Sequence, residues 1–279
     1  MMQTEIEESN RHSREFWKVF AHAIPGGEAF ERDGLSIANA KQPWFFLNLG
    51  MLNRPIADQS DLRYRAQEAF DHFEPGNKPW ALAASEDWFG PNATWVLSSV
   101  GLAHKLDLTG MLAEHLGPPI RPLPQAQLRR IEDEQTRFAL ADLNAEGYGV
   151  PREWARQALG SEALWQKPLF GIIASIGSEP VSGAFALPID DALYIGWVAT
   201  SKSHRGMGLA ELVIRACLED ARKATGLERT ILHATDAGLP VYTRMGYRTV
   251  VKFPFYSPET LTSLESVDDS EVRSCSYSI

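Results

Sequence analysis

The strongest structural signal in the chain is the segment Val198-Ala199-Thr200-Ser201-Lys202-Ser203-His204-Arg205-Gly206-Met207-Gly208-Leu209-Ala210, where a strand-like run passes into a helical one. Its core is Arg205-x-x-Gly208-x-Ala210, with an extra glycine at position 206. Small residues let the backbone turn tightly and approach a ligand. The first N–H groups of the helix lack intrahelical partners, and the helix dipole adds positive potential there. The segment therefore predicts a binding site for pyrophosphate.

Three other interpretations of this loop can be weighed from the residues alone. A P-loop requires a Lys-Ser/Thr pair after its second glycine, where this chain has Leu209 and Ala210. A dinucleotide fingerprint requires a third glycine where Glu211 stands, and only about 70 residues follow, too few for a dinucleotide domain. A helix start that binds no ligand stays open as an alternative.

The elements around the loop follow a regular order. Three strand-like runs are separated by turn residues, which predicts an antiparallel meander. A helix from Gly206 to about Thr225 ends at the cap residue Gly226. The other expected elements are helices over 133–147, 151–159 and 239–245, the meander strands over 170–176, 181–187 and 192–200, and strands over 230–234 and 247–255.

This order, together with the motif, resembles the GNAT superfamily of N-acetyltransferases, which use acetyl-coenzyme A. The resemblance covers roughly residues 126–279. Residues 205–210 match the family's Arg/Gln-x-x-Gly-x-Gly/Ala signature, and residues 238–247 look like its late tyrosine helix with the glycine and aromatic residue that follow. One departure is Lys202, which stands where many members have proline.

The resemblance implies a cofactor site and a proton donor. The strand before the loop is expected to splay from its neighbour, so that the backbone of Val198, Ala199 and Thr200 pairs with the pantetheine arm of the cofactor. Backbone N–H groups of the signature residues would hold the pyrophosphate. These cofactor-binding residues are Arg205, Gly206, Met207, Gly208, Leu209 and Ala210.

Tyrosine, histidine and carboxylate residues are the candidates for proton transfer. Tyr242 is expected to act as general acid toward the leaving thiolate, with simple packing of its ring as the alternative. His233 is a candidate proton relay, with a hydrogen-bonded core histidine as the alternative. The amine's general base is left open among ordered water and four carboxylates. Those carboxylates are Glu146, Asp190, Asp191 and Asp236.

Two aromatic residues lie on the strand that precedes the loop. Strict alternation places Tyr194 with Gly196 and Val198 on one face, and Trp197 with residues 193 and 195 on the other. Either aromatic is a candidate for the acceptor pocket, although core packing is the commoner role for strand aromatics.

The first half of the chain has no copy of the signature loop. A helix is expected over 11–24 and another over 60–73, with strands over 43–50, 79–84 and 95–100. The segment Gly117-Pro118-Pro119-Ile120-Arg121-Pro122-Leu123-Pro124 contains four prolines and predicts an extended linker. Two domains follow, 1–125 and 126–279. The first is either a degenerate GNAT-like copy or a cap that shapes the acceptor pocket.

Composition excludes several classes of protein. The chain has 279 residues, 44% of them hydrophobic, and a formal net charge of −9. The absence of a basic excess argues against nucleic-acid binding. With two cysteines, Cys217 and Cys275, no disulfide framework and no metal site is expected, and the setting should be reducing. An acidic N-terminus and short apolar runs predict a cytoplasmic location and no membrane insertion.

The sequence therefore predicts an α/β (α+β) fold with a mixed, mostly antiparallel sheet flanked by helices, preceded by a second, smaller α/β domain. The predicted function is transfer of an acetyl group from acetyl-coenzyme A, as cosubstrate, to a primary amine on a small molecule or a protein. The alternatives are a non-catalytic coenzyme A-binding sensor or interaction protein and, less consistent with the loop, a dinucleotide-dependent oxidoreductase.

Overall fold

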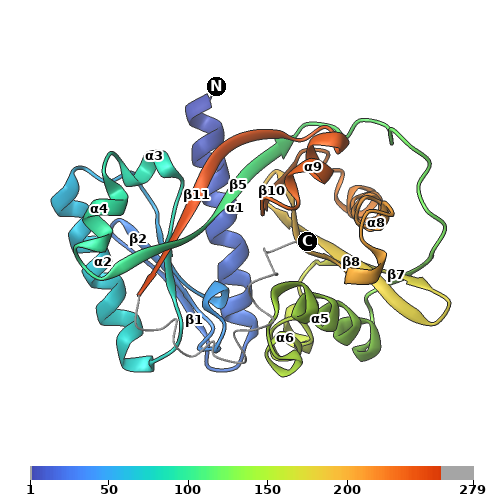
Figure 1. Ribbon diagram of the computed structural model, residues 1–279, viewed down its shortest axis with the longest axis horizontal. Coiled ribbons are helices and arrows are strands. Elements are labelled where there is room, and N and C mark those ends of the chain that lie inside the picture. Colours follow the sequence, from blue (N-terminus) through green and yellow to red (C-terminus); the bar gives the residue numbers. More distant parts are fainter. Residues whose placement is uncertain (1, 259–279) are drawn as a thin grey trace. The chain divides into compact units, whose positions relative to one another are not determined.

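The computed structural model describes residues 2–258 and divides them into two compact units (Figure 1). Of the described residues, the first unit contains those up to Thr109 and those from Val250 to Pro258. The second unit contains Gly110–Thr249. Among the described residues, no helix is long and apolar enough to cross a membrane.

The first unit is a sheet with helices. Strands β1, β2 and β3 form an antiparallel meander, β3 pairs with β4 in parallel, and β4 pairs with β11 antiparallel. Its elements are α1 (Met2–Ala23), β1 (Glu28–Arg32), β2 (Leu35–Asn39), a 3-10 turn (Phe45–Leu47), β3 (Asn48–Leu52), α2 (Gln59–Phe73), a 3-10 turn (Glu74–Gly76), β4 (Ala81–Ala83), α3 (Glu86–Phe89), α4 (Ala93–Ser98), the beginning of β5 (Leu102–Ala113) and most of β11 (Arg248–Pro258).

The second unit repeats this plan with longer strands. Strands β6 to β9 are antiparallel in sequence order, and β9 pairs with β10 in parallel. Its elements are the end of β5, β6 (Gln127–Arg130), α5 (Glu134–Tyr148), α6 (Arg152–Leu159), α7 (Glu162–Trp165), β7 (Phe170–Ile176), β8 (Glu179–Ile189), β9 (Ala192–Thr200), a 3-10 turn (Lys202–His204), α8 (Leu209–Thr225), β10 (Thr230–Ala234) and α9 (Leu239–Met245).

Both units thus contain a three-stranded antiparallel meander, a long helix and a strand parallel to the last meander strand. Their last strands are exchanged. Strand β5 comes from the first half of the sequence and lies next to β10, whereas β11 ends the second half and pairs with β4 through Phe255–Ala83 and Tyr256–Leu82. The chain therefore passes between its units twice, whereas a single linker at the proline-rich segment predicts one passage.

For this reason the two units differ from the expected domains 1–125 and 126–279. The contact boundary falls at Thr109 rather than at the prolines, and β11 returns to the first unit. The proline-rich segment 117–124 is indeed without helix or strand, but it lies inside the second unit. The expected loose tail after Pro258 falls outside the described residues.

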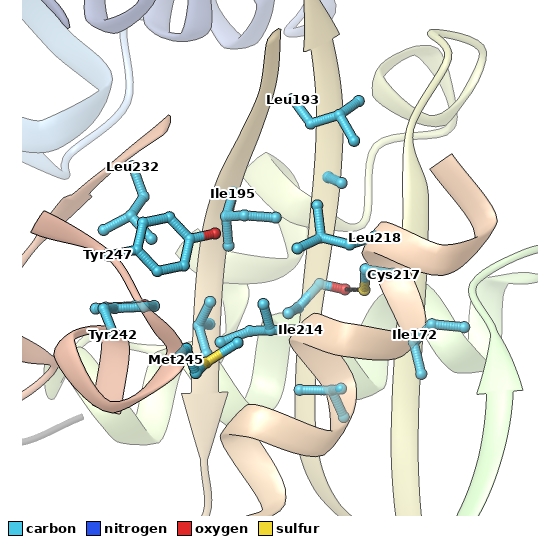
Figure 2. Packing of buried hydrophobic residues seen from close by; sticks show 14 of the residues in the cluster. Ile172, Leu193, Ile195, Ile214, Cys217, Leu218, Leu232, Tyr242, Met245 and Tyr247 are labelled. Atoms are coloured by element: carbon cyan, nitrogen blue, oxygen red, sulfur yellow. Dashed lines mark hydrogen bonds between the residues drawn. The ribbon is translucent and has the colours of Figure 1, made fainter. Parts of the chain in front are cut away.

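The core of the second unit lies between its sheet and α8 and α9 (Figure 2). Leu193 and Ile195 from β9 belong to the same cluster as Ile214 and Leu218 from α8. Cys217 is fully buried there, and its thiol donates to the carbonyl of Ala184 at 3.2 Å. Burial raises the pKa of this thiol, because a thiolate would lose its hydration. Cys217 is therefore a packing residue.

The sequence predictions for the second unit are confirmed almost to the residue. The structure has the expected strands 170–176, 192–200 and 230–234 and the helix 239–245, while α8 begins at Leu209 because the two glycines before it have positive φ angles of 76° and 85°. Short strand β6 was not predicted from its polar sequence.

Two predictions in the first unit were wrong. Residues 95–100 are mostly helical rather than a strand, with the adjacent Val96 and Leu97 both buried and Trp95 exposed. In 43–50, only the last three residues belong to a strand, because the buried Asn48 amide donates to the carbonyls of Gln42 and Pro79 at 2.7 Å and bends the chain. Strands β1, β2 and β5 were not predicted.

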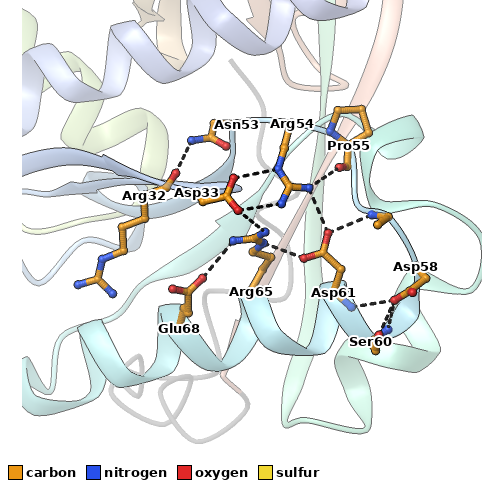
Figure 3. Close-up of polar contacts among 11 residues, drawn as sticks. Arg32, Asp33, Asn53, Arg54, Pro55, Asp58, Ser60, Asp61, Arg65 and Glu68 are labelled. Carbon is orange, nitrogen blue, oxygen red and sulfur yellow. Dashed lines mark hydrogen bonds and ion pairs between the residues drawn. The ribbon is translucent and has the colours of Figure 1, made fainter.

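The start of α2 is capped by the chain's own carboxylates (Figure 3). Asp58 accepts from the backbone N–H groups of Ser60 and Asp61 at 2.8 and 3.0 Å, and Asp61 accepts from the N–H of Ala57 at 3.0 Å. Arg54 and the buried Arg65 in turn pair with Asp61. The hydrogen bond from the Ser60 hydroxyl, with those from the backbone, holds the pKa of Asp58 below its usual value.

We predict that Asp58→Asn makes the stability of the protein less sensitive to acid. A lowered folded-state pKa contributes stability above the unfolded pKa, near 3.8, and that contribution disappears as the pH falls through the folded value. The urea midpoint of the variant should lie below that of the parent at pH 7, and the gap should close toward pH 3. Asp71→Asn, at the other end of α2, is the control. A gap that widens in acid would contradict this assignment of the cap.

Candidate active site

Strand β9 contains a bulge at Trp197. Its pairing with β8 is regular as far as Phe185–Gly196 and resumes at Gly183–Ala199, so β9 has one extra residue. Trp197 has a φ of 52°, in the left-handed region that residues other than glycine rarely adopt. Such backbone strain persists only where the surroundings impose it.

The bulge changes which side chains share a face. Val198 joins Leu193 and Ile195 in the core, whereas Trp197 packs edge-on against Tyr148 at a centroid distance of 5.7 Å. The predicted alternation is therefore wrong beyond Gly196, because the extra residue reverses the pattern. Trp197 is buried, as is Tyr194.

Asn144 of α5 holds the bulge in place. Its side chain is fully buried, and its Nδ2 donates to the carbonyl oxygen of Trp197 at 3.1 Å and to that of Leu140 at 2.9 Å. A carbonyl displaced from the sheet by a bulge needs a new donor, because a buried unpaired polar group costs free energy. Helix α5 is in turn fixed at its start by a capping box between Asp133 and Thr136.

Strand β9 also separates from its parallel neighbour. Within the described residues, β10 pairs with β9 only at Thr230–Leu193 and Ile231–Tyr194. From Ile195 to Thr200, the edge of β9 that faces β10 is therefore not paired with it. This unpaired part contains the predicted pantetheine-binding residues Val198, Ala199 and Thr200. The expected splay is present in the geometry, and its role in binding remains a prediction.

The loop after β9 is built for a backbone turn. The guanidinium of Arg205 donates to the carbonyl of Thr200 at 3.3 Å, which closes the loop onto the strand end. Gly206 and Gly208 have positive φ angles, and a Cβ on Gly206 would meet no atom within 4 Å. Met207, between the two glycines, is exposed.

Helix α8 starts without a side-chain cap at Gly208. In contrast, α2 and α5 begin at Asp58 and Asp133, whose carboxylates accept from their first-turn N–H groups. The predicted residues Leu209 and Ala210 form the first turn of α8. The donors at the start of α8 thus suit an external anion, and the corresponding donors of α2 are satisfied by the protein itself.

Tyr242 lies on α9 and is buried in the core of the second unit. Its ring contacts that of Tyr247 edge-on at 5.7 Å (Figure 2). Among the described residues no group hydrogen-bonds to its hydroxyl. Burial raises the pKa of Tyr242, since the phenolate would lose hydration, and the neighbouring Tyr247 and Tyr148 act in the same direction. Its side chain is therefore a neutral hydroxyl at physiological pH.

His233, on β10, is half-buried and contacts Tyr194. The Tyr194 hydroxyl and His233 Nδ1 are 2.7 Å apart, and the two rings stack at 5.7 Å. Burial raises the pKa of Tyr194 well above its usual value. The contact agrees with the hydrogen-bonded alternative for His233, and a proton-relay role stays a prediction.

The four candidate carboxylates are not gathered at one place. Glu146, at the end of α5, accepts from the backbone N–H of Lys202 at 2.8 Å and so steadies the loop. Asp190 and Asp191 form the turn between β8 and β9, and Asp236 is exposed before α9. A cavity of about 450 Å³ in this unit is lined by residues including Arg130, Phe170 and Asp220. No predicted site residue lines it.

Two comparisons with known proteins agree with this geometry. Residues 128–247 match the family model described as "Acetyltransferase (GNAT) family". A GCN5-related N-acetyltransferase from Kribbella flavida has a similar fold, with a TM-score of 0.68 and 15% identity, over 90% of this chain and 95% of that one. A tandem GNAT protein from the clavulanic acid biosynthesis pathway gives a TM-score of 0.54 and 13% identity, over 80% and 77% of the two chains. No curated protein sequence matches the chain.

The fold that contains the bulged strand and the uncapped helix is similar to that of the GCN5-related N-acetyltransferase from Kribbella flavida. Residues 128–247 thus match the GNAT family, and the likeness of the longer chain to the Kribbella flavida protein is one of fold. The two-unit layout is also that of the tandem GNAT neighbour.

Sequence reasoning did not find Asn144 or the bulge. Asn144 is a polar residue on the buried face of a helix whose other buried positions are mainly apolar. A polar residue at such a position indicates a buried hydrogen bond, and this pattern could have singled out Asn144. The bulge has no such signal, because Trp197 is an ordinary strand residue by composition.

We predict that Asn144→Leu lowers the free energy of unfolding by about 1–3 kcal/mol, because the Trp197 carbonyl loses its donor in a buried site. Urea denaturation measures this effect. Gln135→Leu, which replaces an exposed amide on the same helix, should stay within about 0.5 kcal/mol of the parent. Equal stability of Asn144→Leu and the parent would show that Asn144 does not hold the bulge.

Proposed function

We propose that the protein transfers an acetyl group from acetyl-coenzyme A to a primary amine. The observation that most supports this function is the end of β9. There a strand edge outside the β10 ladder leads into a glycine loop and a helix that no side chain caps. The acceptor is proposed to be a small molecule or a protein amine.

Each residue set has a proposed task. The backbone of Val198, Ala199 and Thr200 holds the pantetheine arm, and the N–H groups of residues 205–210 hold the pyrophosphate. Both tasks rest on backbone groups, so they require local geometry more than particular side chains. The bulge at Trp197 and the glycines provide that geometry.

The chemical step is proposed to be direct attack. The lone pair of the neutral amine forms the new C–N bond with the thioester carbonyl carbon, and the C–S bond breaks as the thiolate leaves. Tyr242 gives its proton to that sulfur, and the attacking nitrogen loses one proton to water or to a carboxylate. Holding the two reactants together supplies much of the rate enhancement.

We predict that Gly206→Ala weakens acetyl-coenzyme A binding at least tenfold. Gly226→Ala is a matched control, because Gly226 caps the other end of α8 with nearly the same φ, 75° against 76°, and equally open surroundings. Each variant should lose about 1 kcal/mol of stability from the left-handed alanine. Calorimetric titration should show one acetyl-coenzyme A per chain for the parent and for Gly226→Ala.

Two calorimetric results would count against the proposal. Equal affinity of Gly206→Ala and Gly226→Ala would remove the loop from the site. A stoichiometry of two would mean that the first unit also binds the cofactor, despite the carboxylates that occupy the start of α2.

We predict that Tyr242→Phe lowers kcat about 100-fold while the dissociation constant of acetyl-coenzyme A stays within twofold. Since burial raises the pKa of Tyr242, kcat of the parent should not fall through loss of this proton up to about pH 9. Steady-state rates on an amine found by screening measure both effects. Tyr64→Phe, an exposed tyrosine of the first unit, is the control. An unchanged kcat in Tyr242→Phe would exclude Tyr242 as the acid.

A parent that binds acetyl-coenzyme A but acetylates no amine in such a screen would instead be the non-catalytic coenzyme A-binding sensor.

A further inference from the structure

The proline-rich segment 117–124 runs along the predicted cofactor loop. It is anchored at its start, where the N–H of Gly117 donates to the carbonyl of Met245 at 2.9 Å and its carbonyl accepts from Arg215 Nη2 at 2.8 Å. Arg215 is itself held by the buried carboxylate of Glu211 in the first turn of α8. The segment is therefore tied to both α8 and α9, the helices that carry the proposed site.

The far part of the segment lies against the loop itself. Arg121 Nη2 is 3.4 Å from the carbonyl oxygen of Gly206. A Cβ built on Gly208 would lie 3.4 Å from Arg121 Nη2 and 3.4 Å from Pro124 Cδ. The guanidinium of Arg121 is thus next to the two glycines whose neighbouring N–H groups are proposed to hold pyrophosphate.

The charge of Arg121 has no carboxylate partner within the described part of the chain, and its long bond to the Gly206 carbonyl is a weak one. Several other arginines of this unit are paired with carboxylates: Arg129 with Asp133, Arg130 with Asp220, Arg156 with Asp142 and Arg215 with Glu211.

An exposed guanidinium beside uncapped helix N–H groups is suited to a phosphate. Arginine recognises phosphate through two parallel hydrogen bonds. To bind one, Arg121 would lose only its long hydrogen bond to the carbonyl of Gly206.

We propose that Arg121 binds the pyrophosphate of coenzyme A, and that the proline-rich segment forms the outer wall of the cofactor site. The inference rests on the proposed function. It assigns a side chain outside the glycine signature to the cofactor, and it gives the prolines a purpose, because a stiff segment loses little entropy when it positions one arginine.

The test compares two ligands by calorimetry, coenzyme A and 3′-dephospho-coenzyme A, which keeps the pyrophosphate. Arg121→Gln should weaken both by the same factor, about 10- to 100-fold, and Arg121→Lys should weaken them less, since it keeps the charge and loses the fork. The variants should retain the circular dichroism spectrum and urea midpoint of the parent. Arg129→Gln removes the same charge from a paired arginine and should leave both affinities unchanged.

Each other result overturns the inference. If Arg121→Gln lost affinity for coenzyme A alone, Arg121 would bind the 3′-phosphate instead. If its affinity for both ligands were unchanged, Arg121 would only position the proline-rich segment. An equal loss in Arg129→Gln would indicate a general effect of net charge. If the parent binds neither ligand, the proposed function itself fails, and that result differs from failure of the inference alone.

Discussion

The N–H groups that every helix leaves without partners at its start govern this structure. In α2 they are satisfied by Asp58 within the chain, and Asp61 ties the preceding residue to the same turn. In α8 the helix begins at Gly208 with no side-chain cap. The two units share an order of elements, but the N–H groups at the start of α2 are satisfied within the chain, whereas those at the start of α8 suit an external anion. The glycines, the short turn before them and the guanidinium of Arg121 all lie around that helix start.

The second constraint is the bulge in β9. A tryptophan in the left-handed region and a strand that leaves its parallel neighbour after two paired residues are both unfavourable in isolation. The fully buried amide of Asn144 compensates by bonding the displaced carbonyl. The bulge thus depends on a buried polar contact from α5, and the strand edge that is proposed to hold the pantetheine arm lies just beyond it.

The second unit was predictable because its strands and helices are long, periodic and separated by turn residues. The strand 192–200 and the helix 239–245 needed no tertiary information. The exchange of β5 and β11 was not predictable, since pairing between distant strands leaves no local pattern. In the first unit, the bend at buried Asn48 and the exposed Trp95 depend on tertiary contacts and misled the local reasoning. In the candidate site, the glycine loop could be predicted from the sequence. The contacts of Asn144 and Arg121 could not, because both residues meet segments that are distant in the sequence.

The most direct test is hydrogen–deuterium exchange with and without acetyl-coenzyme A, followed by mass spectrometry of peptides over 198–212 and 53–62. The ligand should slow exchange of the backbone N–H groups at the start of α8 and leave those at the start of α2 unchanged, because Asp58 already occupies the latter. Protection at α2, or none at α8 under saturating ligand, would contradict the assignment of the cofactor site to the second unit.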